Sequence, residues 1–170
     1  MSKTFAAQVN RVPQDKELSA AQEYLCRESN KLYNCTLYLA RQLSFKAGKF
    51  SNGYWLSSQM KLNSHMKALY TSAAQQTCIS VGEAFKSFKE LLKLWRKGEL
   101  TEKPKPPKYR TSDGLFQIGY PQRWLKLVDG VVKVPMGKAC KAWFNLPEIF
   151  LPFPTNLNWN QVRELQIVPR

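Results

Sequence analysis

One helical pattern, residues 72–98, constrains the fold more than any other stretch of this chain. Its sequence is SAAQQTCISVGEAFKSFKELLKLWRKG, and apolar side chains recur at alternating spacings of four and three residues. Side chains with this spacing lie along one face of an α-helix. Ser72 and Gln75 are typical of a capping box at the helix start, and Gly98 is typical of the residue after the last turn. The apolar face, which must pack against other helices, consists of Ala74, Cys78, Val81, Phe85, Phe88, Leu92 and Trp95.

A basic stripe runs along the same predicted helix and continues past its end. The sequence EKPKPPKYR (residues 102–110) follows, and its prolines favour an extended chain that holds the lysines along a line. Residues 84–110 contain nine Lys and Arg against three Glu, which gives +6 of the formal net charge of +14. A charge run is most often a solvated face, and a proline-rich stretch is often a plain linker, but the continuity favours anion binding. The predicted nucleic-acid backbone contacts here are Lys86, Lys89, Lys93, Arg96, Lys97, Lys103, Lys105, Lys108 and Arg110.

The charge balance of the whole chain also indicates a polyanionic partner. The 170 residues include 26 Lys and Arg against 12 Asp and Glu, and the pI is about 9.8. Nucleic acid is the favoured partner over an anionic membrane, because we expect the basic face to lie opposite the apolar stripe, which is what a helical bundle would bury. No apolar run approaches the roughly 20 residues that span a bilayer, and the start MSKTFAAQV lacks a hydrophobic signal core. We therefore expect a cytoplasmic protein without a membrane partner; the sequence does not indicate its oligomeric state.

The sequence offers few residues for catalysis or metal binding. The four cysteines form no C-x-x-C pair, and the single histidine, His65, lies in a polar connector where we expect a surface position. Glycine-rich nucleotide-binding motifs are not found. We therefore predict no catalytic residue, no metal ligand and no cofactor. The weakest alternative for function is a small nuclease that uses Asp113, Asp129 and Glu148.

A second long helix is predicted in the first third of the chain. Leu18, Leu25, Leu32 and Leu39 recur every seven residues, and the pattern ends near Ala47-Gly48. The helix start is either a capping box at Ser19 and Gln22 or a cap at Asp15, one turn earlier. A coiled-coil seam is the competing interpretation, but the break at residues 48–53 stops it after about four heptads. Residues 3–9 weakly predict a strand. Residues 54–62 predict a short helix with Trp55 and Leu56 inward, and residues 63–70 a connector.

After residue 111 the pattern predicts strands. Residues 115–120, 141–146 and 163–168 each favour a strand, and residues 147–160 a proline-rich loop. Asp129-Gly130 predicts a two-residue type I′ hairpin, which sets the register. Leu125, Leu127, Val132 and Val134 then share one face, whereas Lys126 and Lys133 lie opposite each other on the other. Like charges in this position destabilise by up to about 1 kcal/mol, so either a phosphate neutralises the pair or both side chains splay into water.

These elements together predict an α+β fold, in which a helical bundle interrupts a β-barrel. Residues 1–12 would supply the first barrel strand, residues 13–103 the bundle, and residues 104–170 the remaining strands.

In this order the motifs resemble the N-terminal half of the TnpB/OrfB family, transposon-encoded RNA-guided DNA endonucleases related to miniature type V CRISPR effectors. KTFAAQVNRVP resembles the opening strand of that family. AAQEYLCRESNKLYNCTLYLARQ resembles its first helix, with Tyr33-Asn34 and Ala40-Arg41 at family positions. EAFKSFKELLKLWRKG resembles the later helix, KPKPPKYR the P-x-[FY]-[KR] segment, and LKLVDGVVKVPMG the hairpin before an L-P-x-x-G step, with Met136 at a variable position. The resemblance covers nearly the whole chain, and the order of the motifs carries it.

The resemblance implies a wedge-like barrel and a recognition-like bundle that together bind guide RNA and target DNA. In this family base pairing reads the sequence, while the protein reads backbone shape and a short adjacent motif. By position, Tyr54, Gln75, Gln76 and Gln117 correspond to contacts with that motif, although Gln75 also has a capping role and Tyr54 could simply pack. Glutamine suits base reading, because it pairs with an adenine edge in the major groove. The backbone contacts would extend to Lys126 and Lys133.

The resemblance also implies what the chain lacks. The family's RuvC-like domain, with its acidic residues and C-x-x-C zinc finger, is missing, so we expect no DNA cleavage by this chain and no Mg²⁺ or Zn²⁺ site in it. The chain would be either a truncated product or one half of a larger assembly. The alternative from another functional class is a stand-alone DNA-binding regulator of a mobile element that acts without RNA.

Overall fold

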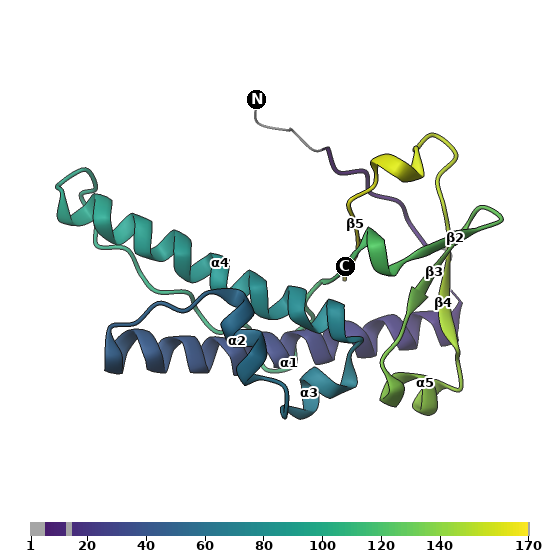
Figure 1. Cartoon of the computed structure of the whole chain (residues 1–170), viewed down its shortest axis with the longest axis horizontal. Coiled ribbons are helices and arrows are strands. Elements are labelled where there is room, and N and C mark those ends of the chain that lie inside the picture. Colours follow the sequence, from purple (N-terminus) through teal and green to yellow (C-terminus); the bar gives the residue numbers. More distant parts are fainter. Residues whose placement is uncertain (1–5, 13–14, 170) are drawn as a thin grey trace.

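The computed structural model describes residues 6–12 and 15–169, and in this part of the chain helices and small antiparallel sheets are combined (Figure 1). The helices are α1 (Lys16–Ala47), α2 (Gly53–Gln59), α3 (Ser64–Ala68), α4 (Thr71–Arg96) and α5 (Lys138–Phe144). The strands are β1 (Ile118–Pro121), β2 (Lys126–Val128), β3 (Val131–Pro135), β4 (Glu148–Pro152) and β5 (Glu164–Ile167). The predicted α+β class is confirmed. β1 pairs with β5, and β2, β3 and β4 form a second sheet, so the described strands make two open sheets rather than a closed barrel.

The first long helix, α1, is confirmed, and its start decides between the two predicted caps. Asp15 is the N-cap, and its side chain accepts a hydrogen bond from the Glu17 amide at 3.2 Å. The capping box at Ser19 is wrong, because Ser19 lies inside the helix. Gly48 ends the helix in the left-handed region, with φ +62°, which glycine adopts without strain.

The helix α4 has the predicted apolar face, but its start differs from the prediction. The five members from Ala74 to Phe88 are buried, and Leu92 and Trp95 are half-buried. The capping box is wrong: Tyr70 is the N-cap without a side-chain bond, and Ser72 turns into the core instead. At the other end Gly98 has φ +78°, its amide bonds the Trp95 carbonyl, and the Glu99 amide bonds the Leu94 carbonyl, each at 3.0 Å. This is a Schellman ending, as the glycine predicts.

The short helix α2 crosses α4 at a contact between two glycines. A Cβ atom added to Gly82 would lie 2.6 Å from the Cα of Gly53, and one added to Gly53 would overlap the Ile79 backbone. The two helices therefore touch backbone to backbone. Leu56 is fully buried as predicted, whereas Trp55, predicted inward, is 40% exposed.

The predicted hairpin is confirmed in turn type and register. Asp129 and Gly130 have φ values of +49° and +76°, as a type I′ turn requires, and Lys126 pairs with Lys133. The inward face is also confirmed, with Leu125, Val132 and Val134 buried and Leu127 packed against the same core.

Three other expectations for the strand region need correction. Residues 141–146 lie mostly in helix α5 rather than in a strand, because Cys140 and Phe144, four residues apart, pack inward against the core. The predicted loop at residues 147–160 contains β4, whose Ile149 and Leu151 alternate into the core beside β3. The strand predicted at 115–120 begins only at Ile118. Residues 163–168 do contain a strand, β5.

The predicted first strand is not seen in the described part of residues 3–9. Residues 6–9 have irregular backbone, and residues 3–5 lie outside the described residues.

Helices and sheets share one apolar core. One buried cluster includes Leu25 and Leu32 of α1, Tyr120 of β1 and Val134 of β3. A second cluster, in the helical half, includes Val81 and Phe85 of α4. The long helices therefore hold the sheets in place directly. None of the helices in the described ranges has the length and hydropathy to cross a bilayer.

An ion-paired carboxylate fixes the short helix α3 to α1. Glu28, whose side chain is only 10% exposed, accepts hydrogen bonds from Lys31 at 3.0 Å and contacts Nδ1 of His65 at 2.7 Å. The surface position predicted for His65 is therefore wrong, because the ring turns toward this carboxylate and is 27% exposed.

We expect this ion pair to make stability depend on pH. Burial raises the pKa of Glu28, but hydrogen bonds from His65 and Lys31 together outweigh it and hold the pKa below its usual value. A lowered folded pKa stabilises the protein above the unfolded pKa of about 4.3, and the stabilisation is lost as pH falls through the folded pKa. In urea unfolding at pH 7, Glu28→Gln should cost about 1.5–3 kcal/mol, and the difference should shrink below pH 4.

The matched control is Glu23→Gln, because Glu23 forms an exposed ion pair with Arg27 on the same helix. It should change the free energy of unfolding by no more than about 0.5 kcal/mol. A Glu28→Gln difference that stays constant from pH 3 to pH 7 would show that the carboxylate's charge has no part in the effect.

Candidate nucleic-acid interface

The basic stripe of α4 is exposed along the C-terminal half of the helix. Its members Lys86, Lys89, Lys93, Arg96 and Lys97 all have exposed side chains. At 3.6 residues per turn the stripe lies roughly 110° around the helix from the middle of the apolar face. It thus flanks the core rather than opposing it. This flank faces the connection between α1 and α2. The ammonium nitrogen of Lys89 lies 5.7 Å from the ring centroid of Phe50 in that connection.

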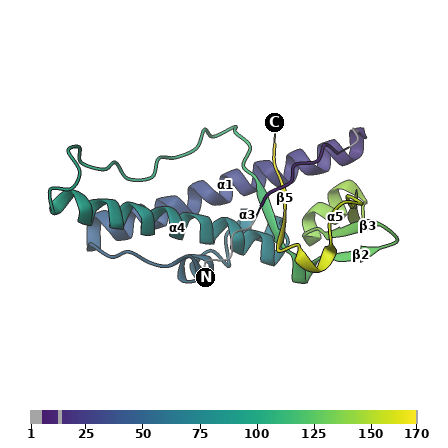
Figure 2. The ribbon, with the colours of Figure 1, turned by 90° about the horizontal axis from the view of Figure 1, so that it is seen from above.

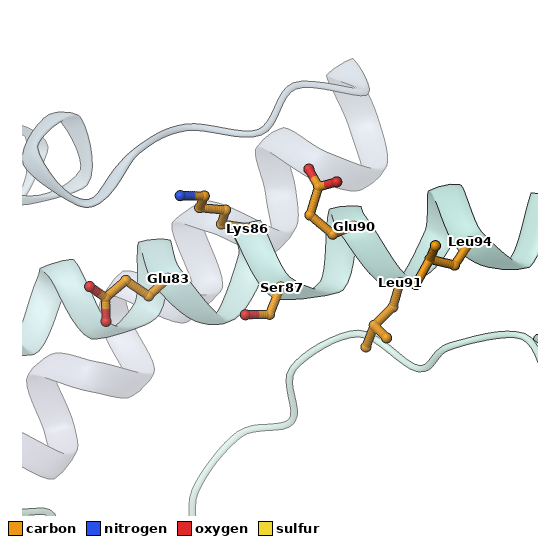
Figure 3. A pocket seen from close by; sticks show the side chains of 6 residues that line it. All are labelled: Glu83, Lys86, Ser87, Glu90, Leu91 and Leu94. Carbon is orange, nitrogen blue, oxygen red and sulfur yellow. The ribbon is translucent and has the colours of Figure 1, made fainter. Parts of the chain in front are cut away.

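The outermost side of α4 is not basic. A shallow hollow of about 620 Å³ follows it, and Figure 3 shows the six lining side chains, all from α4: Glu83, Lys86, Ser87, Glu90, Leu91 and Leu94. The bond from Lys93 to Glu90, at 2.9 Å, lowers the pKa of Glu90, so this carboxylate stays charged. With two carboxylates against one lysine, this side disfavours a phosphate. A polyanion on α4 would follow the flank that carries Lys89 and Arg96.

The proline-rich segment, here called the strap (residues 103–111), is fixed along α1 rather than hanging free. Asn30 donates to the Thr111 carbonyl at 2.8 Å, and Arg41 donates to the Pro107 carbonyl at 2.7 Å. Asn34 forms two bonds with the backbone of Arg110, at 2.9 and 3.0 Å. Residues 30, 34 and 41 share one helix face, so α1 binds the backbone of the strap at successive points.

The strap holds its lysines outward. Pro104, Pro106 and Pro107 are half-buried, whereas Lys103, Lys105 and Lys108 are exposed. Lys105 and Lys108 are three residues apart, which is one turn of an extended polyproline chain, so they project to the same side. The plain-linker interpretation does not account for bonds from three α1 side chains.

Arg110 has a structural role that the sequence did not indicate. Its guanidinium donates to Asn30 at 3.1 Å and to the Leu115 carbonyl at 3.3 Å, and it lies 4.4 Å from the ring centroid of Phe116. Among the residues predicted to contact a nucleic-acid backbone, Arg110 therefore makes the most contacts within the protein itself.

The strap and the α4 stripe lie on opposite flanks of the helical layer. Figure 2 shows the strap along one side of α1 and α4, and the connection from α1 to α2 along the other. The cation–π contacts agree, since Lys89 meets Phe50 on one flank while Lys103 lies 5.4 Å from the Trp95 ring on the other. The single basic run predicted from the sequence is therefore divided into two surfaces.

We expect Asn30→Ala to release the strap. Asn30 is fully buried, and its loss removes the hydrogen bond that Arg110 Nε donates to it. It also removes the bond to the Thr111 carbonyl, which then keeps only the one from the Gly114 amide at 3.1 Å. This should lower the free energy of unfolding by about 2–4 kcal/mol, measured by urea denaturation, and speed trypsin cleavage after Lys108. The control Asn156→Ala removes an exposed amide that bonds only the exposed Gln8, and should change little. Equal effects from both variants would mean that the strap is not held through Asn30.

The hairpin lysines lie on the outer face of the three-stranded sheet. Lys126 is exposed and Lys133 half-buried, and they pair directly in register. Lys133 has a partner that the sequence did not indicate: its ammonium nitrogen lies 5.8 Å from the ring centroid of Phe150 in β4.

The four residues predicted to read an adjacent motif lie in α2, in α4 and just before β1. Tyr54 of α2 is 74% exposed, which speaks against the alternative that it simply packs. Gln75 is exposed near the start of α4 and makes no capping bond, and Gln76 is half-buried. Gln117, exposed, precedes β1, and its carbonyl accepts from Ser29 at 3.1 Å.

The three carboxylates of the nuclease alternative are not brought together. Asp129 occupies the hairpin turn beyond Val131, whereas Glu148 pairs with Pro135 at the opposite end of β3. Four strand residues separate these ends by about 13 Å, too far for both to ligate one metal ion. Within residues 6–12 and 15–169, no three His, Cys, Asp or Glu side chains are grouped as a metal site would need.

Several residues of the interface were missed by the sequence reasoning. Asn30, Asn34 and Arg41 could have been found from their spacing, because polar residues that share one helix face with fully buried neighbours need partners. Phe150 could not have been found in this way, because it lies in a stretch whose prolines predict a loop.

A scan against models of protein families finds no family that matches the chain, and a search of curated proteins finds no match. The geometry of the two basic flanks and of the sheet therefore carries the functional conclusion.

Proposed function

We propose that this chain is the nucleic-acid-binding part of a TnpB-like, transposon-associated protein, which binds guide-type RNA and target DNA without cutting. One observation carries the proposal. Lysines on two opposite flanks are held outward by independent means, one set by the packing of α4 and the other by the bonds between α1 and the strap. Two separate basic surfaces suit a folded RNA that straddles α4, or an RNA and a DNA bound at the same time.

The finer assignment follows the sequence resemblance. The two sheets would belong to a wedge-like barrel and the helices α1 to α4 to a recognition-like bundle, working in the cytoplasm. Phosphate contacts would come from the α4 stripe, from Lys103, Lys105 and Lys108 of the strap, and from Lys126 and Lys133, which fix position without reading bases. Tyr54, Gln75, Gln76 and Gln117 are the proposed readers of a motif beside the target. The cutting chemistry would belong to another domain or chain.

The test is the identity of the nucleic acid that the purified protein selects. The protein is incubated with total RNA and with sheared genomic DNA of its source organism, and the retained molecules are sequenced after nuclease digestion. We expect a discrete structured RNA to be protected. Plasmid DNA incubated with the complex and Mg²⁺ should stay intact, and cleavage that disappears in Asp113→Ala would contradict the non-cutting role.

Retention of duplex DNA without any RNA would instead support the stand-alone regulator of a mobile element. Retention of neither nucleic acid at 50 mM salt would contradict both functions, because phosphate contacts are strongest at low ionic strength.

A further inference from the structure

The outer face of the sheet formed by β2, β3 and β4 carries a row of three side chains. Register places Lys126 beside Lys133, and Lys133 beside Phe150. Their strand neighbours Leu127, Val132 and Leu151 point to the core, so the row faces away from it. Adjacent strands are about 4.8 Å apart, and the row therefore spans about 10 Å.

Phe150 is exposed in the middle of a strand, where an aromatic residue is ordinarily covered. Its side chain is 47% exposed, and β4 is the edge of the sheet among the described strands. The Lys133 ammonium lies on one side of the ring, 5.8 Å from its centroid. With this ammonium beside the ring, nearly half of the side chain remains exposed at the open edge of the sheet.

The surroundings of this row limit where an anion can lie. The neighbouring row toward the turn is apolar, with Val128, Val131 and Pro152. One carboxylate, Asp129, lies in the hairpin turn past this apolar row. Another, Glu148, lies at the opposite end of the face, so both ends repel an anion. The position between Lys126 and Lys133 is the one place on the face with two adjacent positive charges.

We propose that this face binds an unpaired nucleic-acid strand, with one base stacked on Phe150 and the neighbouring phosphate between Lys126 and Lys133. Proteins that bind single strands combine cations for the backbone with aromatic rings for the bases, and each stacked base contributes about 1–3 kcal/mol. The inference rests on the proposed nucleic-acid binding, but it concerns a surface separate from α4 and the strap. It assigns that surface to unpaired nucleotides.

The central experiment compares two oligonucleotides of equal length and charge. One is a single-stranded dT 12-mer, and the other carries abasic sites in place of the bases. Phe150→Leu keeps an apolar side chain of similar reach on the exposed face but removes the ring. We expect it to weaken binding of the dT oligomer about fivefold or more, and to leave the affinity for the abasic oligomer unchanged. Phe150→Trp should restore the affinity for dT, because the larger ring also stacks.

Two controls separate stacking from a general effect. Trp143→Leu removes a ring that is 79% exposed on α5, away from this sheet face, and should leave both affinities unchanged. An oligo-U 12-mer tested beside dT distinguishes RNA from DNA as the preferred strand, since only RNA presents the 2′-hydroxyl. Preference for either sugar supports the stacking site and identifies its natural strand.

Lys126→Thr tests the phosphate position independently of the ring. It should weaken binding of both oligomers and reduce the slope of log affinity against log salt by about 0.7, the value for one single-strand phosphate contact. The melting temperature of the free protein should stay the same or rise, because the repulsion from Lys133 is removed and threonine favours strands.

The outcomes separate this inference from the proposed function. If the protein binds neither oligomer, nor a duplex, nor a structured RNA, both fail together. If nucleic acid binds through the α4 stripe while Phe150→Leu behaves as the unmodified protein with dT, the stacking site is wrong and the proposed function stands. If Phe150→Leu loses affinity equally for dT and abasic oligomers, the ring supports the fold of the sheet and does not stack on a base.

Discussion

Gly82→Ala is expected to lower the free energy of unfolding by about 3 kcal/mol or more, although alanine is the better helix former. In a free helix this change would stabilise by about 1 kcal/mol. Here the added Cβ would lie 2.6 Å from the Cα of Gly53, against backbone that no rotamer change can move aside. The helices α2 and α4 must separate, which exposes Leu56 and opens the core. For a protein with about 5–15 kcal/mol of total stability, the loss is large.

Urea denaturation at 25 °C measures this effect, and the sign of the change decides the result. Ser87→Ala serves as the control, because Ser87 is exposed one turn further along α4 and the change should be neutral or slightly stabilising. A stabilised Gly82→Ala protein would mean that α2 does not contact α4 as described. The α4 stripe would then lose the support of Phe50, which reaches Lys89 from the chain that leads into α2.

The second large effect is expected from changing Lys86, Lys89 and Lys93 together to Gln. All three side chains are exposed, so the melting temperature should stay within a few degrees of the unmodified protein. Affinity for the selected RNA should fall, and the slope of log affinity against log salt should decrease by about 1–3, since each phosphate contact contributes roughly 0.7 to 0.9. The lower value applies if Lys86, which borders the two carboxylates, makes no contact. Binding measured from 50 to 300 mM salt gives this slope directly.

The matched control removes the same charge elsewhere. Lys61, Lys67 and Lys141 are exposed around α3 and α5, at the far end of α4, about 20 Å from Lys86 by helix rise. Their triple change to Gln should alter the slope by much less than the first variant. If both triple variants reduce the slope equally, binding depends on net charge alone, and the α4 stripe is only a solvated face.

A third variant, Lys105→Gln with Lys108→Gln, tests the division into two flanks. If one folded RNA straddles α4, the losses from stripe and strap should add in the same binding curve, because the sites share no side chain. If RNA and DNA occupy the flanks separately, the strap variant should affect one ligand and the stripe variant the other.

The sequence determined the elements whose conformation depends on near neighbours. The spacing of apolar residues fixed α1 and α4, and Gly48 and Gly98 fixed their ends, because only glycine adopts the left-handed turn readily. Asp129-Gly130 fixed the hairpin and with it the pairing of Lys126 and Lys133, since a two-residue turn sets the register. In each case the controlling contacts lie within a few residues along the chain.

Tertiary structure alone decided the elements that depend on distant partners. Residues 147–160 read as a loop because their prolines break the local pattern. β4 forms there because its short alternation, with Ile149 and Leu151 inward, is completed by pairing with β3. Cys140 and Phe144 became helical because α1 offers Tyr24 as a neighbour, 5.7 Å between ring centroids. Ser72 does not cap α4, because the first turn of this helix is buried and the Ser72 side chain turns into the core.

The candidate interface divides in the same way. Composition and the helical pattern identified the lysines of α4 and of the strap. Their separation onto two flanks follows from the docking of the strap on Asn30, Asn34 and Arg41, which lie 66 to 81 residues away in the chain. Likewise, the register of the hairpin was readable, but the position of Phe150 beside Lys133 was not, since it required a third strand. Local sequence thus set which side chains are basic and exposed, and long-range packing decided which of them share a surface.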